Sequence, residues 1–221
     1  MTRHAVALQK TLIDMRELAF TETPIVKRSQ RPLRLETLVW AVVNEWRQVA
    51  RASGLTLHVM VQEQGLYILG DEKRLRWAIG NLIDNAIKYT LVGGVLSLEI
   101  RGTADDKAQL RVRDNGVGIL KEDLPRVFTR FYRGTPLSPG GSVLHIPGMG
   151  QGLYVSRQII EAHGGSIEVR SKPGKGTAVM FTLPLTSPQT LDLPLFAAEA
   201  DMDGETVQLP QYAMFDEDEL P

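Results

Sequence analysis

Three polar side chains, Asn81, Asn85 and Lys88, recur at intervals of four and three residues within the segment 71–89. This spacing places all three on one stripe of a helix. An amide oxygen is a hard ligand that suits magnesium, which takes few ligands from the protein and completes its octahedron with water and phosphate oxygens. A lysine on the same stripe can contact a phosphate. The stripe therefore predicts a site for a metal-bound phosphate; the alternative is the ordinary polar face of an amphipathic helix.

A second candidate site is the sequence Asp-Asn-Gly-Val-Gly-Ile at residues 114–119, directly after an expected strand. The carboxylate of Asp114 can accept a hydrogen bond from an exocyclic amine of the kind that adenine carries. Gly116 and Gly118 allow the backbone to approach a flat ligand closely and to adopt a positive φ. Asp-Asn-Gly is also a common turn sequence, so by itself the segment is equally consistent with a plain loop.

Aromatic and cationic side chains gather in residues 128–133, Phe-Thr-Arg-Phe-Tyr-Arg, just before a stretch rich in Gly, Pro and Ser at 134–152. Such a cluster can hinge and anchor a movable segment, and Arg130 or Arg133 can face a phosphate. Core aromatics flanked by surface charges are the alternative interpretation.

A glycine-rich helix start, Gly-Met-Gly-Gln-Gly-Leu, follows at residues 148–153. Glycines at a helix N-terminus present unpaired N–H groups and the positive end of the helix dipole to a phosphate. The segment lacks the Gly-Lys-Ser/Thr ending of a Walker A loop, and it does not occupy the strand–turn–helix position of a dinucleotide fingerprint. On its own it is a weak signal of a phosphate site.

The elements that must position these four segments follow from hydrophobic periodicity. Helical spacing predicts helices at 1–20, 35–52, 71–89, 120–127 and 153–162, with Asp71 as the expected N-cap of the third. Alternation predicts strands at 55–61, 66–69, 95–101, 110–113, 166–170 and 178–183. Strands in pairs between single helices predict a two-layer α/β sandwich with a mixed sheet, preceded by the helix at 1–20 and a linker at 21–32.

The composition bounds the class of protein. A chain of 221 residues with 43% hydrophobic side chains is long enough for one large domain with its own core. It contains no cysteine, which excludes a disulfide framework, a thiolate nucleophile and a cysteine-ligated metal. No apolar run reaches the roughly 20 residues of a membrane span, and charges interrupt the N-terminal segment, so we expect no signal peptide and a cytoplasmic location.

Charge is distributed unevenly along the chain. Residues 186–221 carry nine Asp and Glu and no Lys or Arg, so this segment has a net charge of -9, and residues 1–185 have a net charge of +8. A basic body suits anionic ligands, such as nucleotide phosphates or an acidic partner. The acidic segment is interpreted as a solvated, flexible tail, with folding back onto the basic body as the alternative.

The four segments resemble, in their order along the chain, the N, G1, F and G2 boxes of the catalytic domain of sensor histidine kinases. The resemblance covers residues 35–185 and extends to the Gly-Lys-Gly-Thr turn at 174–177, where the family has a similar Gly-x-Gly-Thr turn. It implies the Bergerat ATP-binding fold, a two-layer α/β sandwich, over residues 33–186. Residues 1–32 are expected to hold part of a dimerisation and phosphoacceptor hairpin with its linker, and residues 187–221 the acidic tail.

Residue by residue, the resemblance implies a pocket for ATP and Mg²⁺. Asn85 would hold the metal, Lys88 would contact phosphate, and Asn81 would lie near the γ-phosphate. Asp114 would bind the adenine amine, Tyr89 would flank the adenine or ribose, and residues 134–148 would form a movable lid. The implied catalytic residues, Asn81 and Lys88, belong to a larger ATP-binding set: Asn81, Asn85, Lys88, Tyr89, Asp114, Gly116, Gly118, Ile119, Phe131, Arg133, Gly148, Gly150, Gly152, Leu153 and Thr177.

Two features depart from the family pattern. Gln151 stands where the family usually has leucine, which affects the packing of the lid. The helix at 1–20 resembles the second helix of the hairpin, whereas the first helix, with its phosphoacceptor histidine, is missing and none of the four histidines replaces it. The resemblance therefore implies a kinase that binds ATP and phosphorylates a histidine in a domain supplied in cis or in trans. A response regulator is the implied protein partner; no contact with nucleic acid or membrane is expected.

Other functions remain open on the sequence alone. A serine kinase of the anti-sigma type has the same scaffold, although it has no need of the terminal helix. A non-catalytic nucleotide-binding module is indicated only by Gln151 and the missing histidine. An ATP-hydrolysing relative is disfavoured, because Asn81 is not the glutamate that such enzymes use as a base.

Overall fold

The computed structural model describes residues 30–187. The predicted helix at 1–20, most of the predicted linker at 21–32 and the acidic segment beyond residue 187 lie outside the described residues. None of the helices in the described range has both the length and the apolar character of a bilayer span. The elements in chain order are β1 (Arg31–Arg34), α2 (Leu35–Ala52), β2 (Thr56–Val61), β3 (Tyr67–Gly70), α3 (Glu72–Tyr89), β4 (Val95–Gly102), β5 (Lys107–Asp114), the 3-10 helix η2 (Leu124–Arg126), α4 (Gly152–Ala162), β6 (Ser166–Lys172) and β7 (Gly176–Pro184).

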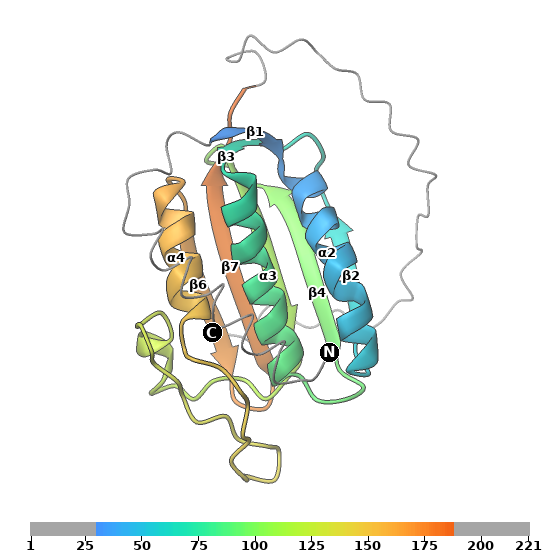
Figure 1. The fold of residues 1–221 in the computed structure, drawn as a ribbon, viewed down its shortest axis with the longest axis vertical. Helices are drawn as coiled ribbons and strands as arrows, with labels where there is room; N and C mark the ends of the chain where they lie inside the picture. The colour runs from blue at the N-terminus through green and yellow to red at the C-terminus, as the bar shows by residue number, and fades with distance from the viewer. Residues whose placement is uncertain (1–29, 188–221) are drawn as a thin grey trace.

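A five-stranded sheet forms one layer of the domain, in the order β2-β4-β5-β7-β6. β2 pairs in parallel with β4, and the other neighbours pair antiparallel, so the sheet is mixed. The helices α2, α3 and α4 lie side by side on one face of this sheet (Figure 1). The predicted two-layer α/β sandwich with a mixed sheet is confirmed.

The core lies between these layers because each presents one apolar side to the other. Alternate residues of β5 are buried, among them Leu110 and Val112, and buried side chains of α3 such as Ile79 and Ile83 recur at helical spacing. Burying a side chain of this size stabilises the fold by about 1.5–3 kcal/mol. The alternation on β5 ends with Asp114, so a carboxylate occupies a core-facing position at the end of the strand.

Two of the predicted elements are wrong in part. Arg31 and Pro32, expected at the end of a linker, pair with β3 in a small second sheet. Their four-residue strand contains a proline and shows no alternating burial, so the pattern does not distinguish it from a linker. The segment 120–127 forms only η2, because Pro125 has no N–H group for the hydrogen bond that an α-helix requires there.

His163 ties the C-terminal end of α4 to the start of α3. Asp71 caps α3 as predicted, since its Oδ1 accepts a hydrogen bond from the Arg74 N–H at 3.2 Å. The Asp71 N–H donates to Nε2 of His163 at 3.0 Å, and Nδ1 of His163 donates to the Ile159 carbonyl at 2.7 Å. This arrangement requires the neutral imidazole. Burial lowers the pKa of His163, which favours the same form.

We expect His163→Ala to destabilise the domain by about 1–3 kcal/mol at about pH 8, because the Asp71 N–H loses its partner and the Ile159 carbonyl loses one of its two donors. Since the pKa of His163 is lowered from 6.5, its contribution is fully present above that value and is lost as the pH falls below it. The cost of the substitution, measured by urea unfolding, should therefore shrink at about pH 5. His145→Ala, at an exposed position, is the matched control; the same pH trend in both variants would contradict this account.

Candidate functional site

The polar stripe of α3 faces the N-terminus of α4. A Cβ placed on Gly152 would lie 3.6 Å from Oδ1 of Asn81 and 3.8 Å from Nδ2 of Asn85, so both asparagines are next to the first turn of α4. Asn81 is only 7% exposed, and its Nδ2 is buried without a hydrogen-bond partner in the part of the chain that the structure describes. A buried donor of this kind is costly unless a ligand or a water accepts its hydrogen bond. The structure thus brings three predicted residues together around an unsatisfied donor.

Lys88 lies on the same stripe, but its ammonium group is held within α3. Nζ of Lys88 donates to Oδ2 of Asp84 at 2.7 Å, and the side chain of Lys88 is 28% exposed. Asp84 is buried and is missing from the predicted site. The i, i+4 spacing of an acid and a lysine is the signal that indicates such a pair. In this structure Lys88 is therefore an ion-pair partner, positioned on the stripe beyond Asn85.

The side chain of the N-cap residue, Gln151, does not cap the first turn of α4. The N–H groups of that turn can therefore donate to a ligand. Gln151 is 3% exposed, and its Oε1 is buried with no hydrogen-bond partner within the described range. Leu153, in the predicted set, packs against the hydrophobic core instead.

At the C-terminal end of α3, Asp114 presents a buried carboxylate. Oδ1 of Asp114 accepts hydrogen bonds from the backbone N–H groups of Gly116 at 2.9 Å and Thr177 at 3.2 Å. Burial raises the pKa of Asp114 from 3.8 to about 6, and the two N–H donors oppose this effect. Because both hydrogen bonds end on Oδ1, Oδ2 is the oxygen that can accept from a ligand amine.

The loop after Asp114 requires glycine at two positions. A Cβ on Gly116 would overlap the carbonyl oxygen of Tyr89. Gly118 has a φ of +71°, and a Cβ there would overlap the carbonyl oxygen of Lys172 at the end of β6. The Val117 N–H donates to the Tyr89 carbonyl at 3.0 Å. The last residue of α3 is therefore joined directly to this loop, while the preceding turns of α3 face α4.

Ser171 connects the same loop to the end of the sheet. Its hydroxyl accepts from the Ile119 N–H at 2.9 Å, donates to the Gly176 carbonyl at 2.7 Å and lies 2.9 Å from the Thr177 hydroxyl. Two predicted residues, Ile119 and Thr177, are thus brought to the Asp114 end through this buried serine. A single serine within a strand has no sequence signal, and Ser171 is absent from the predicted site.

The aromatic segment packs its backbone on the glycine-rich start of α4. A Cβ on Gly150 would lie 2.6 Å from the carbonyl oxygen of Tyr132 and 2.9 Å from the carbonyl carbon of Phe131. Phe131 has a φ of +63°, which is uncommon for an aromatic residue, and it is 57% exposed. Its ring lies 5.0 Å from the guanidinium carbon of Arg130. Phe131 thus reaches the predicted site through its backbone, whereas its side chain is exposed.

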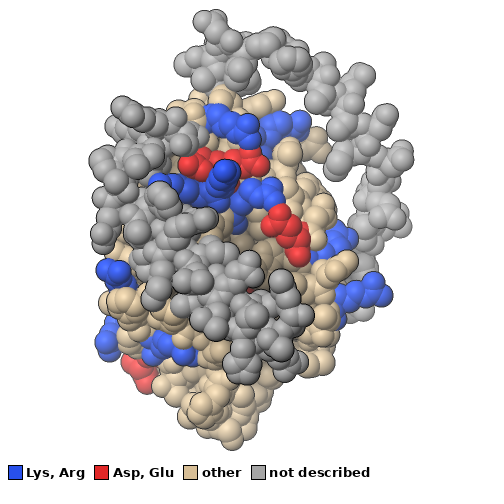
Figure 2. Space-filling view, viewed as in Figure 1, with Lys and Arg blue, Asp and Glu red and all other residues tan. Residues whose placement is uncertain are grey.

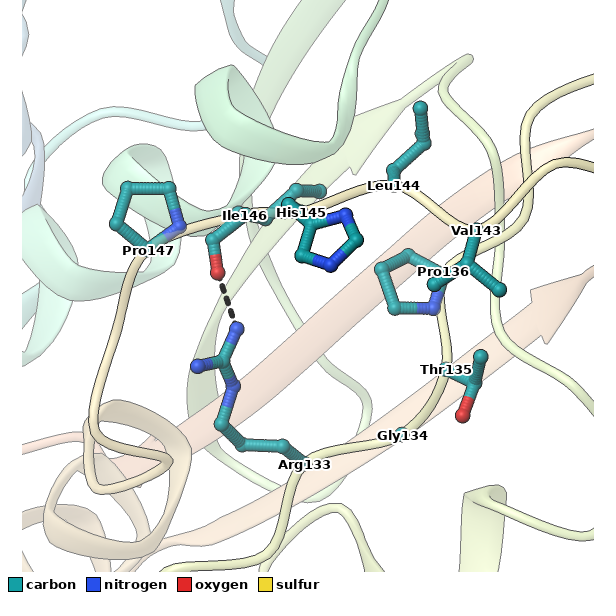
Figure 3. A pocket seen from close by; sticks show the side chains of 9 residues that line it. All are labelled: Arg133, Gly134, Thr135, Pro136, Val143, Leu144, His145, Ile146 and Pro147. Atoms are coloured by element: carbon teal, nitrogen blue, oxygen red, sulfur yellow. Dashed lines mark hydrogen bonds between the residues drawn. The ribbon is translucent and has the colours of Figure 1, made fainter.

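Arg133 closes a pocket inside the segment 134–148. Its guanidinium donates to the Ile146 carbonyl (Figure 3) and to the Gly148 carbonyl, the latter at 2.7 Å. Burial raises the pKa of Tyr89, and the positive charge of Arg133 and a hydrogen bond from it oppose this rise. Arg133 therefore lies close to Tyr89, the last residue of α3. The pocket has a volume of about 520 Å³ and is lined by Arg133, Gly134, Thr135, Pro136, Val143, Leu144, His145, Ile146 and Pro147.

Asp123 fixes the start of this segment. Its Oδ1 accepts a hydrogen bond from the Tyr132 hydroxyl at 2.5 Å, and its Oδ2 accepts one from the Thr135 N–H at 3.3 Å. The hydrogen bond to Asp123 raises the pKa of Tyr132 above its usual 10.0. Asp123 is missing from the predicted site, because its partners are found only once the chain has turned back at η2.

We expect Asp123→Asn to lower the pKa of Tyr132 toward 10.0, because the charged acceptor is removed. The rate of proteolytic cleavage within residues 134–148 should rise by about threefold or more, since their anchor is weakened. Ultraviolet titration, with Tyr132→Phe to identify the signal, and limited proteolysis measure the two effects. Asp105→Asn, in an exposed turn, is the control; unchanged cleavage in Asp123→Asn would contradict the anchoring role.

The two ends of the site differ in chemistry and are joined by α3. One end has two amides and uncapped N–H groups, which suit anionic groups and can offer amide oxygen to a hard metal ion. The other end has a buried carboxylate in a close-packed glycine loop, which suits a flat group with an exocyclic amine. An elongated ligand with an amine at one end and phosphates at the other fits both.

The chain is similar to proteins of a known family. The Histidine kinase-, DNA gyrase B-, and HSP90-like ATPase family matches residues 70–187. The chain is 34% identical over 165 residues to the sensor histidine kinase AtsR of Burkholderia thailandensis, a match that covers 74% of this chain and 27% of AtsR. It is 35% identical over 158 residues to the sensor protein kinase PmrB of Pseudomonas aeruginosa, covering 71% of this chain and 31% of PmrB. The chain thus spans less than a third of these two relatives.

Solved structures of histidine kinases share the fold. The mycobacterial sensor histidine kinase MprB is 27% identical with a TM-score of 0.59, over 71% of this chain and 97% of that one. Full-length ShkA, solved in complex with AMPPNP, is 24% identical with a TM-score of 0.69, over 84% of this chain and 37% of ShkA. The predicted resemblance in fold and family is confirmed.

Proposed function

The chain belongs to the Histidine kinase-, DNA gyrase B-, and HSP90-like ATPase family, and we propose that it is the ATP-binding catalytic domain of a two-component sensor histidine kinase. The proposed reaction transfers the γ-phosphoryl group of ATP to a histidine on another segment or chain. One observation carries the proposal. The Asn81 and Asn85 amides meet the first turn of α4, and the buried carboxylate of Asp114 lies beyond them at the C-terminal end of α3.

The described residues fit a magnesium nucleotide. Oδ2 of Asp114 accepts a hydrogen bond from the adenine amine, and the amide oxygen of Asn85 is the proposed ligand of Mg²⁺. The buried Nδ2 of Asn81, which has no partner among residues 30–187, donates to a phosphate oxygen or to a metal-bound water. Lys88 adds positive charge on the same stripe. Bound Mg²⁺ supplies neutralisation of the charge on the phosphates.

The residues at the phosphate end suit transfer to histidine better than hydrolysis. A neutral imidazole is already a nucleophile, so the protein needs to supply position and charge neutralisation rather than a strong base. Asn81 stands where the resemblance places the glutamate base of ATP-hydrolysing relatives, and an amide cannot take a proton from water. We therefore expect slow hydrolysis of ATP in the absence of an acceptor.

The proposal includes two protein partners. The phosphoacceptor histidine belongs to a helical hairpin supplied in cis or in trans, and a response regulator receives the phosphoryl group from that histidine. The names of the curated relatives AtsR and PmrB, a sensor histidine kinase and a sensor protein kinase, support this assignment. Because ATP is the donor, we place the domain in the cytoplasm.

Two measurements on the whole chain test the proposal. Titration of a fluorescent ATP analogue, with and without magnesium, should show magnesium-dependent binding. Incubation with γ-labelled ATP and a supplied phosphoacceptor hairpin should then give a labelled hairpin whose phosphate is lost in acid and retained in alkali, as phosphohistidine is. Acid-stable label would indicate a serine kinase of the anti-sigma type, and binding without any transfer would indicate a non-catalytic module. Either outcome would overturn the assignment as a histidine kinase.

A further inference from the structure

The face of the five-stranded sheet opposite the helices is basic. Alternate residues of β5, such as Leu110 and Val112, are buried under the helices, so the residues between them point to the opposite face. The residues of β4, β7 and β6 that pair with those outward residues lie on the same face. The charged residues that these strands place on it are the bases Arg101, Lys107, Arg111, Arg113, Arg170 and Lys172 and the acids Glu99 and Glu168. This set, the basic sheet face, has a net charge of +4, whereas residues 30–187, with 20 bases and 14 acids, have +6 in total.

Two arginines lie side by side toward the Asp114 end of the basic sheet face. Arg113 and Arg170 are both register partners of Ala178, one on each side of it. Ala178 is only 4% exposed, although α2, α3 and α4 pack on the opposite face (Figure 1). In the next row, Arg111 lies over Met180, with 3.3 Å between Nε and Sδ. Long basic side chains therefore cover this face and keep their charged groups at its surface.

On the helix side, several bases pair with acids. Arg31 pairs with Glu72, and Arg76 pairs with Glu45. Figure 2 shows blue and red side chains next to one another near the β1 end of this side. On the basic sheet face, Arg111 pairs with Glu99, Arg170 pairs with Glu168, and Lys107 pairs with Asp105 of the turn before β5. Its six bases still outnumber its two acids, so most of the positive surplus of the described residues lies there.

We propose that residues 188–221 of the same chain dock on the basic sheet face. This segment carries nine Asp and Glu and no Lys or Arg, and its most acidic run is Asp-Glu-Asp-Glu at 216–219. It follows Ser187, beside β3 and the start of β5: the Thr186 N–H donates to the Tyr67 carbonyl at 2.8 Å, and the Leu185 N–H donates to the Asp106 carbonyl at 3.0 Å. The acidic segment therefore starts at the edge of the face where Lys107 begins β5.

The segment is long enough to reach the whole face. β5 has eight residues, which correspond to about 27 Å of strand. The first acid, Asp192, is five residues beyond Ser187, a distance of at most about 17 Å when extended. Between Ser187 and the run at 216–219 there are 28 residues, so this run can reach the far end of the strands without being fully extended.

The attraction is electrostatic and is strengthened by the tether. An exposed ion pair is individually weak, but a segment of the same chain is present at an effective concentration in the millimolar range. Salt screens such pairs, because the Debye length falls from about 14 Å at about 0.05 M to a few Å at about 0.5 M. Docking should therefore be lost at high salt. It does not depend on the proposed kinase function.

Zero-length carbodiimide coupling of the whole chain tests the proposal, because it joins carboxylates to lysine amines that are in contact. Lys107 and Lys172 lie on the basic sheet face, and Lys73, exposed on α3, is the comparison. Peptide mapping should find residues 188–221 coupled to Lys107 and Lys172 about fivefold more than to Lys73 at low salt. The preference should disappear at about 0.5 M salt.

A charge variant locates the interaction. Arg113→Gln with Arg170→Gln should reduce coupling at Lys107 and Lys172 by about threefold, whereas Arg47→Gln with Arg51→Gln, on exposed positions of α2, should leave it unchanged. If the first double variant does not fold, Arg170→Gln alone, at an exposed position, serves the same purpose. Equal coupling at Lys73, coupling mainly to Lys10 or Lys27, or coupled product found only as a dimer would each overturn intramolecular docking on this face.

Discussion

Replacing Asn85 by alanine is expected to abolish magnesium-dependent ATP binding, with a loss of affinity of about hundredfold or more when magnesium is present. The amide of Asn85 lies beside the first turn of α4 and is the proposed ligand of the metal. Alanine removes the amide oxygen without disturbing α3, because it is the best helix former. Titration of a fluorescent ATP analogue, in magnesium and in chelator, measures the effect.

Asn44→Ala, at an exposed position of α2, is the matched control for Asn85→Ala and should bind like the wild type. Circular dichroism establishes that both variants are folded. If Asn85→Ala retained the affinity gained from magnesium, the assignment of Asn85 to the metal would be wrong. An equal loss with and without magnesium would point instead to a general distortion of the site.

Asp114→Asn is expected to lower the affinity for ATP by about hundredfold or more and to leave the weak affinity for GTP unchanged. The amide can keep one oxygen on the N–H groups of Gly116 and Thr177, which then directs its NH₂ group to the adenine amine. Two donors would face each other, whereas the wild-type carboxylate offers an acceptor. The ATP-to-GTP affinity ratio, by isothermal titration calorimetry, is the measurement. A ratio unchanged from the wild type would exclude Asp114 from base recognition.

The raised pKa of Asp114 gives ATP affinity and the stability of the fold opposite dependences on pH. Since burial raises the pKa of Asp114 to about 6, ATP affinity of the wild type should fall roughly tenfold per unit below that pH. For the fold the sign is reversed: a raised pKa stabilises the folded state below the ordinary value of 3.8, and this stabilisation is lost as the pH rises through about 6. Asp114→Asn should therefore gain stability relative to the wild type in urea unfolding above about pH 6, and should lose the pH dependence of binding.

The helices were the most predictable part of the fold. The bounds of α2 are those expected from the spacing, and α3 begins directly after its predicted cap, Asp71, because an 18-residue amphipathic helix repeats its pattern several times. β1 was missed for the opposite reason. It has four residues and owes its strand conformation to β3, which lies more than thirty residues further along the chain. The hydrophobic pattern within residues 31–34 contains no information about a pairing strand so far along the chain.

The predicted site residues divide in a similar way. Asn81, Asn85 and Asp114 belong to motifs whose order along the chain indicates their neighbourhood, and the structure places them on or next to α3. Asp123 and Ser171 could not be predicted, because each acts on backbone groups that only the folded chain brings within reach. The contacts that position the site are therefore less visible in the sequence than the groups proposed to bind the ligand.

The position of α3 in the chain has a consequence for folding. It lies within residues 62–94, the connection between the parallel strands β2 and β4, and parallel strands need such a crossover. Closing the loop at 62–94 costs conformational entropy, and this cost is met before the pairing of β2 with β4 stabilises the chain. The two asparagines meet the first turn of α4 only when α3 and α4 are packed together. Nucleotide bound there would act as a reporter of folding, and its concentration would set the melting temperature.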